Sequence, residues 1–265
     1  MRSALRTIDL TVLALPVSLL AAWYLVAETG QVPSYLLPSP KELVRVTKDF
    51  AWGGTGLTPY SGTLMEHVAA SIMRVLSGFS LAAFLGLSLG LLTGRVSLIK
   101  RLMDPTIHLV RAVPGIGWLP LAMVWFGVGE KTTVFLIALA AFFPVYINAA
   151  HGFANVPVHL LRAGQMLGAD KYALFRSVIL PAAFPSLIVG LRLGLGVSWG
   201  FLVLGELTGV TKGLGAVMMD ARLLGQTEMI PIAMICIGLL GKITDMLLIK
   251  VCNRVYPGHV GKVSG

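Results

Sequence analysis

The residue types that usually carry out chemistry are sparse in this chain, and none stands in a recognisable catalytic pattern. A nucleotide-binding P-loop requires G-x-x-x-x-G-K-[ST], and the nearest fragments, residues 129–132 (GEKT) and 241–244 (GKIT), do not match it. Neither H-E-x-x-H nor G-x-S-x-G occurs, and the histidines and cysteines lack metal-ligand spacing. The sequence therefore predicts a chain that is not an enzyme, binds no metal and does not hydrolyse ATP through a P-loop. A membrane-embedded enzyme is an alternative, but the sequence contains no recognisable nucleophile, metal site or acid pair that would support it.

Two arginines, Arg111 and Arg192, lie in or near long apolar stretches. A charge inside a bilayer is costly and is therefore a functional-site hypothesis by default. The guanidinium group matches planar oxyanions through paired N–H donors, so both side chains are candidates for a path that carries an anion. Arg111 is expected near the cytoplasmic end of its span, which leaves the alternative that it extends to the interface or holds a loop carbonyl.

Other ionisable residues of the apolar stretches are expected to have structural roles. Lys242 and Asp245 stand three positions apart on one helical face, and we predict that they neutralise each other. Arg74 and Glu66 are predicted to anchor the outer start of their span at the interface. Glu206 would repel an anion, so we assign it to packing or to a gate contact.

The composition leaves too few polar residues to form a water-exposed surface. Hydrophobic residues make up 56% and charged residues 12% of the chain, against about 25% charged residues in a typical soluble domain. The net charge of +9 comes from lysines and arginines scattered between apolar runs. Nucleic-acid-binding proteins instead cluster such residues in patches, so we predict a lipid bilayer as partner and no nucleic acid.

Six apolar stretches are long enough to cross about 30 Å of hydrocarbon, which takes about 20 residues. They predict an all-α, polytopic membrane protein with about six transmembrane helices. A cleaved signal peptide is the alternative for the first stretch, but its apolar core is long and lacks a clear cleavage site. The predicted spans are residues 10–27, 72–92, 107–128, 132–150, 184–204 and 230–249.

The distribution of basic residues predicts the orientation. Lysines and arginines are more frequent on one side of the six spans, and this side is expected to be cytoplasmic. An even number of spans then places both termini in the cytoplasm. On the outer side, residues 41–50 predict an amphipathic helix at the interface, and residues 217–224 a short helix.

Glycines recur at four-residue spacing inside the second and fifth spans. Such stripes let helix backbones approach closely in lipid, and we expect intrachain packing. A dimer interface or a path for a passenger is the alternative. The stripes are Gly86, Gly90 and Gly94, then Gly190 and Gly194, then Gly196 and Gly200.

The longest cytoplasmic loop, residues 156–181, predicts two short helices joined at Gly168. Glycine tolerates the left-handed conformation that ends a helix. Asp170 is a suitable N-cap for the second helix, and Pro181 is expected to end that helix before the fifth span begins.

This loop resembles the coupling motif of ABC importer permeases, which reads E-A-A, three residues, Gly, nine residues and I-x-L-P. Residues 162–164 (RAG) occupy E-A-A, Gly168 is the glycine, and residues 178–181 (VILP) form the end. Arg162 replaces the family's acid, and Gly164 replaces its second alanine. Further segments resemble the nitrate/sulfonate/taurine branch, and residues 240–245 resemble its alkanesulfonate members. These segments are residues 36–40, 110–114, 118–121, 125–130, 142–148, 190–192 and 206–215.

The resemblance, which covers residues 36–256, implies a type I ABC importer permease fold with cytoplasmic coupling helices. It divides the chain into a membrane anchor with a periplasmic amphipathic segment (1–66), a permease core (67–256) and a cytoplasmic tail (257–265). The implied function is import of a small anion such as an aliphatic sulfonate, taurine or a nitrate-like ion across the bacterial inner membrane. The residues implied to contact the ATPase are Arg162, Ala163, Gly164, Leu167, Gly168, Ala169, Asp170, Leu174, Phe175 and Pro181.

The resemblance also implies the partners of the chain. These are a second copy of the permease, two ATP-binding cassette ATPase subunits and a periplasmic substrate-binding protein. ATP and Mg²⁺ would be bound by the ATPase, and no cofactor by this chain. The rival interpretation is an ATP-independent secondary transporter or channel, for which inverted repeats and mid-span carboxylates would be expected.

Overall fold

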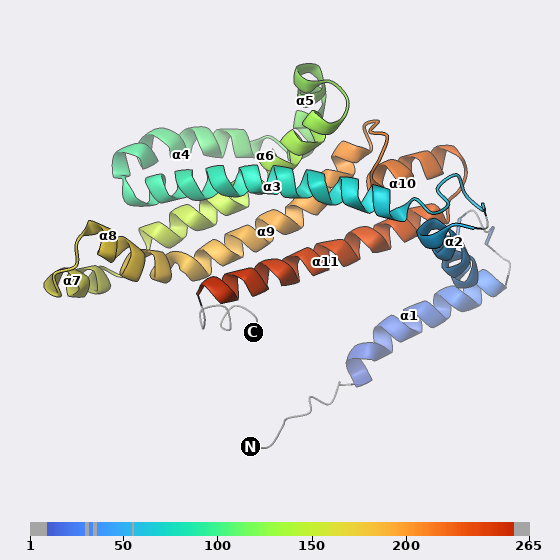
Figure 1. Ribbon diagram of the computed structural model, residues 1–265, viewed down its shortest axis with the longest axis horizontal. Helices are drawn as coiled ribbons and strands as arrows, with labels where there is room; N and C mark the ends of the chain where they lie inside the picture. Colours follow the sequence, from blue (N-terminus) through green and yellow to red (C-terminus); the bar gives the residue numbers. More distant parts are fainter. Residues whose placement is uncertain (1–9, 30–31, 34–35, 55, 257–265) are drawn as a thin grey trace. The chain divides into compact units, whose positions relative to one another are not determined.

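The computed structural model describes residues 10–29, 32–33, 36–54 and 56–256, and every regular element in these ranges is helical (Figure 1). The all-α prediction is therefore confirmed. Most elements are α-helices, whereas η1 is a 3-10 helix and η2 a π-helix. The elements are α1 (Leu10–Glu28), α2 (Pro40–Trp52), α3 (Leu64–Arg95), α4 (Ser97–Ala112), η1 (Gly115–Trp118), α5 (Leu119–Phe126), α6 (Glu130–Ala154), α7 (Val158–Met166), α8 (Lys171–Leu174), η2 (Phe175–Ile179), α9 (Leu180–Glu206), α10 (Leu214–Leu223) and α11 (Met229–Val255).

Four helical stretches are long and apolar enough to cross a membrane, and they confirm four of the predicted spans. They are α3, α6, the continuous helix Lys171–Glu206 and α11. The first predicted span forms α1, whose apolar part Val17–Glu28 is shorter than these. The part of the chain that the structure describes thus holds four spans, or five with a bent pair of helices, where the sequence predicted about six.

The bent pair corrects the third predicted span. Residues 107–128 were expected to form one helix, but the chain bends by 89° between α4 and the η1–α5 segment. Pro114 is the physical reason, because proline disfavours the α conformation of the residue before it. Val113 is accordingly extended, with φ −73° and ψ 122°. The apolar composition concealed this break.

The chain forms two compact units. One comprises Met1–Met65 with Met218–Ile232, and the other Glu66–Val217 with Ala233–Gly265. The sequence-based division at residue 66 stays a prediction, and the tail at 257–265 lies outside the described residues. The chemistry discussed below concerns the larger unit.

The smaller unit contains the predicted amphipathic helix, now α2. Ser39 caps its N-terminus by accepting a hydrogen bond from the Glu42 backbone, and Leu43, Val46 and Phe50 are buried. Asp49 is also buried and accepts a 2.7 Å hydrogen bond from the Ser61 hydroxyl. The predicted short helix on the outer side is confirmed as α10.

In the larger unit, α6 packs against α3 on one side and α9 on another through glycines. A Cβ atom at Gly90 would lie 2.5 Å from the Ala149 Cβ, and one at Gly190 would lie 2.7 Å from the Asn148 Cβ. These stripes confirm the packing prediction. A Cβ at Gly196 or Gly200 would meet no atom within 4 Å, so this third stripe does not pack within the chain.

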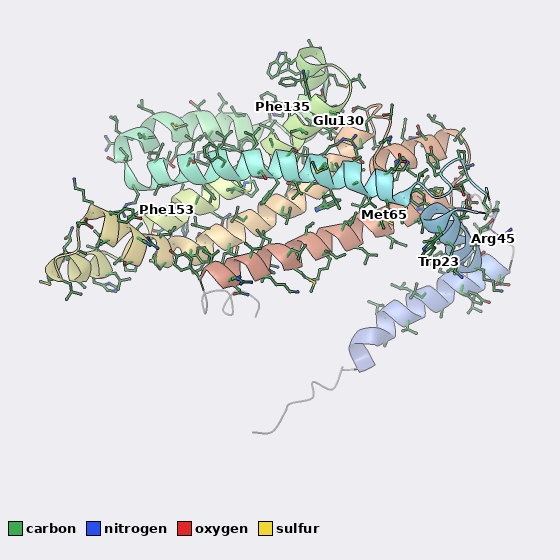
Figure 2. All side chains as sticks on the ribbon, viewed as in Figure 1. Trp23, Arg45, Met65, Glu130, Phe135 and Phe153 are labelled. Carbon is green, nitrogen blue, oxygen red and sulfur yellow. The ribbon has the colours of Figure 1, made fainter. Side chains whose placement is uncertain are left out.

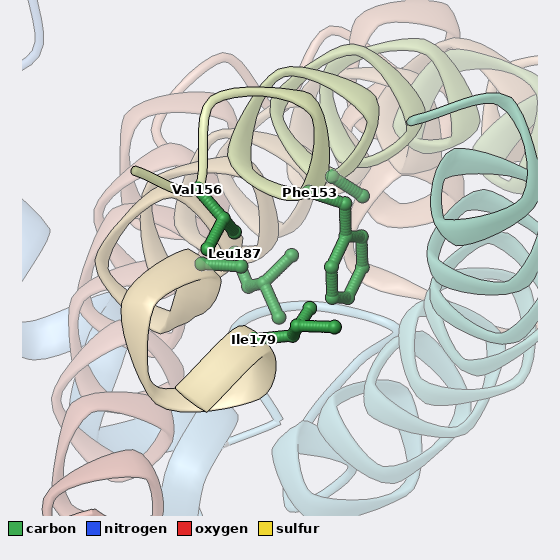
Figure 3. Packing of buried hydrophobic residues seen from close by; sticks show 6 residues of the cluster. Phe153, Val156, Ile179 and Leu187 are labelled. Atoms are coloured by element: carbon green, nitrogen blue, oxygen red, sulfur yellow. The ribbon is translucent and has the colours of Figure 1, made fainter. Parts of the chain in front are cut away.

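A buried cluster joins the loop between α6 and α9 to these two helices. Phe153 and Val156 come from the end of α6 and the residues after it, while Ile179 and Leu187 come from η2 and α9 (Figure 3). Figure 2 labels Glu130 and Phe153, which lie near opposite ends of α6. The cluster fixes the root of the loop described next.

Candidate functional site

The loop between α6 and α9 has two helical segments joined at Gly168, as predicted, but only the first, α7, is a short separate helix. Gly168 has φ +75° directly after α7, a conformation that side chains with a Cβ rarely adopt. Its neighbour Asp170 accepts a 2.7 Å hydrogen bond from the Ala173 backbone N–H and so caps α8. Both local predictions are confirmed.

The role predicted for Pro181 in ending the second helix is wrong. The helix runs without interruption from Lys171 through the π-helical segment η2 to Glu206. Pro181 lies inside this continuous helix, directly after the π-helical segment η2, where the regular i to i−4 bonding is already interrupted. The second half of the loop is therefore continuous with the long apolar helix that follows it.

The tip of the loop exposes large apolar side chains. Met166 is 89% exposed, Leu167 87% and Tyr172 68%. Arg162, Ala163, Gly168 and Asp170 are exposed as well, and Ala169 is half-buried. Leu167 was predicted from the motif, whereas Met166 and Tyr172 were missed because motif spacing does not report exposure.

Three other predicted contact residues also pack within the loop or against its base. A Cβ at Gly164 would lie 2.7 Å from a Leu174 methyl, so a glycine in α7 lets this side chain approach closely. Phe175 stacks on Phe153 with ring centroids 6.5 Å apart. Between α7 and the start of α9 lies a groove of about 460 Å³, lined by residues that include Leu160 and Pro185.

The two arginines predicted to meet an anion have different surroundings. Arg192 on α9 is neutralised by Asp245 on α11 through hydrogen bonds of 2.8 and 3.0 Å. This corrects the predicted Lys242–Asp245 pair: the long guanidinium reaches Asp245 from a neighbouring helix. The Arg192 charge is already satisfied within the chain.

Arg111, in the last turn of α4, lines a cavity of about 180 Å³ with Phe143 of α6 and Phe201 of α9. Within the described ranges, no ion pair or hydrogen bond to its side chain is found. Ala140, which also lines the cavity, lies about 15 Å along α6 from Glu130 and about 21 Å from Ala154, at 1.5 Å per residue. The expected position of Arg111 near the cytoplasmic end is therefore wrong.

A cluster of charged residues joins α3 to the start of α6 and the end of α9. Arg74 of α3 is 4% exposed and binds the Glu206 carboxylate at 2.6 Å, and also pairs with Glu130. The predicted Arg74–Glu66 anchor is wrong, because Glu66 pairs with Lys212 at 2.9 Å. Only the three-dimensional packing of α3, α6 and α9 brings these charges together.

The same α3 face holds the backbone that follows α9. His67, Ser71 and Arg74 recur at helical spacing and bond to the segment Lys212–Leu214. Glu206 accepts a 2.7 Å hydrogen bond from the Gly215 N–H at the start of α10. This arrangement fits the packing role expected for Glu206.

The sequence interpretation missed the aromatic lining of the Arg111 cavity. Trp118, Phe143 and Phe201 come from η1, α6 and α9, and no sequence spacing links them. A signal was nevertheless present, because Pro114 followed by Gly115 indicates a break in an apolar run.

Comparison with known proteins gives one consistent result. Residues 82–250 match the family "Binding-protein-dependent transport system inner membrane component". The protein named aliphatic sulfonates transport permease protein SsuC of Escherichia coli (strain K12) is 38% identical over 92% of this chain and 91% of its own length. The taurine transport system permease protein TauC of the same organism is 34% identical over 91% of this chain and 86% of its own.

A solved structure supports the same fold. A chain of the MetNI methionine ABC transporter in an inward-facing conformation aligns with a TM-score of 0.60 at 18% identity, covering 73% of this chain and 95% of its own. The fold class predicted from the sequence, that of a type I ABC importer permease, is confirmed. The chain is a multi-pass membrane protein and belongs to the family of binding-protein-dependent transport system inner membrane components, the permeases of ATP-driven importers.

Proposed function

We propose that this permease moves a small oxyanion of the sulfonate, taurine or nitrate class from a periplasmic binding protein to the cytoplasm. It acts as a homodimer with two separate ATPase subunits, which bind ATP and Mg²⁺ and perform the hydrolysis. The chain itself is a non-catalytic translocation subunit of the bacterial inner membrane, with both termini in the cytoplasm.

The exposed tip of the α7–α8 loop is the observation that carries this proposal. Met166 and Leu167 are almost fully exposed at the end of a loop whose base is buried. Exposed apolar side chains on a rigid support are typical of a surface that a partner covers. We assign this tip to the ATPase contact.

The continuous helix Lys171–Glu206 supports a route for coupling. A rod that starts in the loop and crosses the membrane transmits a displacement of its end as a rigid-body movement. Closure of the ATPase pair on ATP would draw the two loops together and open the membrane path outward. Hydrolysis would then reset the transporter.

The names of the relatives and the positive charge in the membrane support the choice of passenger. The related proteins are named for sulfonate and taurine transport. Among the residues that the structure describes, no acidic group pairs with the Arg111 guanidinium, and a guanidinium is well suited to bidentate binding of an oxyanion.

Co-purification tests the assignment of the loop. The detergent-solubilised chain, purified from its native host, is expected to retain an ATP-hydrolysing subunit. Gly168→Trp and Leu167→Asp are expected to reduce the retained ATPase at least tenfold, because one changes the turn and the other the apolar contact. Arg254→Gln, at the exposed cytoplasmic end of α11, is the control and should retain the subunit.

Transport by the purified proteins tests the mechanism. Liposomes that contain the complete importer should accumulate the passenger only with ATP and binding protein. Accumulation by the permease alone, without nucleotide, would instead establish the secondary transporter or channel.

A further inference from the structure

The cavity beside Arg111 combines a charged side chain with an apolar lining. It has a volume of about 180 Å³ and lies between the break after α4, the middle of α6 and the second half of α9. None of its lining residues is acidic. Arg111 is the charged group in this lining, so the cavity favours an anion.

The Arg111 side chain cannot face lipid at this depth. It is exposed in the single chain and has no charged partner among the residues described. Charged side chains in membrane spans face a bundle interior or a water-filled cavity, because their desolvation in hydrocarbon is costly. The face of the chain that carries Arg111 must therefore border an aqueous path or another protein surface.

The helix break at the same place supports the aqueous path. Val113 and Pro114 lie between α4 and η1, outside both helices. Backbone outside a helix is tolerated at membrane depth only where protein covers it or where it lines a water-filled cavity. Val113 is exposed and lines the cavity, as does Gly115.

Aromatic side chains form the rest of the wall. A Cβ at Gly115 would lie 2.4 Å from the end of the Phe201 ring, so a larger residue there would displace the ring from the η1 turn. Trp118 and Phe143 complete an apolar surface. The cavity thus offers one cation and several aromatic rings.

We infer that this cavity is the passenger subsite of the membrane path, where Arg111 binds the oxyanion and Phe143, Phe201 and Trp118 surround its apolar group. Arg192 is not part of the subsite, because Asp245 already occupies its guanidinium. The passenger class is a small oxyanion that bears an apolar group. This inference rests on the proposed function and adds the residues that select the passenger.

Substitution of the two arginines tests the binding role. The complete importer is reconstituted in liposomes, and ATP-dependent uptake of labelled ethanesulfonate, taurine and nitrate is measured. Arg111→Gln is expected to reduce uptake of the transported probe about 100-fold, the loss expected for a charge-assisted hydrogen-bonded pair. Uptake by Arg111→Lys should lie between that of the wild type and that of Arg111→Gln, because lysine keeps the charge and loses the bidentate geometry.

The matched control removes the other arginine together with its partner. Arg192→Gln combined with Asp245→Asn leaves no unpaired charge, and its uptake should stay within about threefold of the wild type. Stimulation of ATP hydrolysis by the binding protein should persist in Arg111→Gln, since the α7–α8 loop is unchanged. Loss of that stimulation would show a folding or coupling defect and would overturn the assignment of Arg111 to the passenger.

Chain-length selectivity tests the aromatic wall. Phe201→Ala should raise uptake of pentanesulfonate relative to ethanesulfonate about tenfold, because a removed ring leaves room for additional methylene groups. Phe135→Ala, nearer the Glu130 end of α6 and beside Trp125 and Phe126, is not among the residues that line the cavity and should leave this ratio unchanged.

The outcomes separate this inference from the proposed function. If the wild-type importer is driven by ATP but Arg111→Gln transports with unchanged KM, the subsite is wrong and the proposed function stands. An unchanged selectivity ratio in Phe201→Ala would also reject the aromatic wall. If the wild type takes up none of the probes with ATP, the proposed function fails and the subsite with it.

Discussion

At the scale of single residues, the Arg74–Glu206 pair shows how a charge is accommodated inside this membrane protein. The Glu206 carboxylate is 1% exposed, yet the Arg74 guanidinium, the Ser71 hydroxyl and the Gly215 N–H all donate to it. A buried carboxylate with these donors at a helix start is well compensated. Its oxygens also fix the beginning of α10.

Glu206→Gln tests this compensation. We expect a loss of about 3 kcal/mol in stability, because Arg74 is then left buried with only the more exposed Glu130. The thermal midpoint of the purified chain in detergent, followed by tryptophan fluorescence, measures the loss. The control Glu66→Gln removes an exposed pair with Lys212 and should leave the midpoint nearly unchanged. Equal midpoints for both variants would contradict the compensated pair.

Tyr60 gives a pH-dependent prediction outside the spans. Burial, with a further contribution from the neighbouring Asp220 carboxylate, raises the pKa of Tyr60 to about 12. An unfolded tyrosine titrates near pH 10, so the folded state holds its proton more tightly between about pH 10 and 12. The stabilisation by this group is complete below pH 10 and is lost as the pH rises to 12. Tyr60→Phe should flatten the fall of the thermal midpoint across this interval, and an unchanged fall would exclude the contribution.

At the scale of elements, close helix packing depends on individual glycines. A Cβ at Gly90 would approach the Ala149 Cβ at 2.5 Å and the Ala150 nitrogen at 2.9 Å, so a larger residue has to push α3 away from α6. Gly238 on α11 has no atom within 4 Å of such a Cβ. The same residue type therefore has different roles on two spans.

The pair Gly90→Val and Gly238→Val measures this difference. Gly90→Val should destabilise the chain by about 1–3 kcal/mol or more through overpacking. Gly238→Val should retain the wild-type thermal midpoint within a few degrees, since its added methyl groups meet open space. The argument fails if Gly238→Val is the more destabilised of the two.

The sequence predicted the elements unevenly, for physical reasons. Hydrophobic length indicated α3, α6, α9 and α11, because a bilayer requires about 20 apolar residues whatever their packing. It failed at the third span, where residues 107–128 stay apolar while Pro114 redirects the backbone. The expectation that a proline ends a helix failed at Pro181. The π-helical segment before it already interrupts the regular hydrogen bonds, so the helix continues through the proline.

At the scale of the whole molecule, orientation decides which surface meets the ATPase. The distribution of basic residues predicts that the α7–α8 loop lies in the cytoplasm and α2 outside. The ATPase contact requires this sidedness, because ATP is a cytoplasmic substrate.

Cysteine labelling tests the orientation. In a background with Cys236 and Cys252 replaced by alanine, Leu167→Cys should react with a membrane-impermeant maleimide only in inside-out vesicles. Trp52→Cys, at the exposed end of α2, should react only in right-side-out vesicles. The opposite pattern would invert the topology and remove the ATPase assignment.

The sequence by itself determined the membrane class, four of the spans and the turn of the loop between α6 and α9. These features depend on local composition and on spacing within one segment, where Gly168 and Asp170 are already sufficient to form a turn and a cap. Only the tertiary structure decided which charges meet. Arg192 pairs with Asp245, Arg74 pairs with Glu206 and Glu130, and Arg111 lines an aromatic cavity. Side chains distant in the sequence become neighbours through helix packing, which periodicity and motif spacing do not specify.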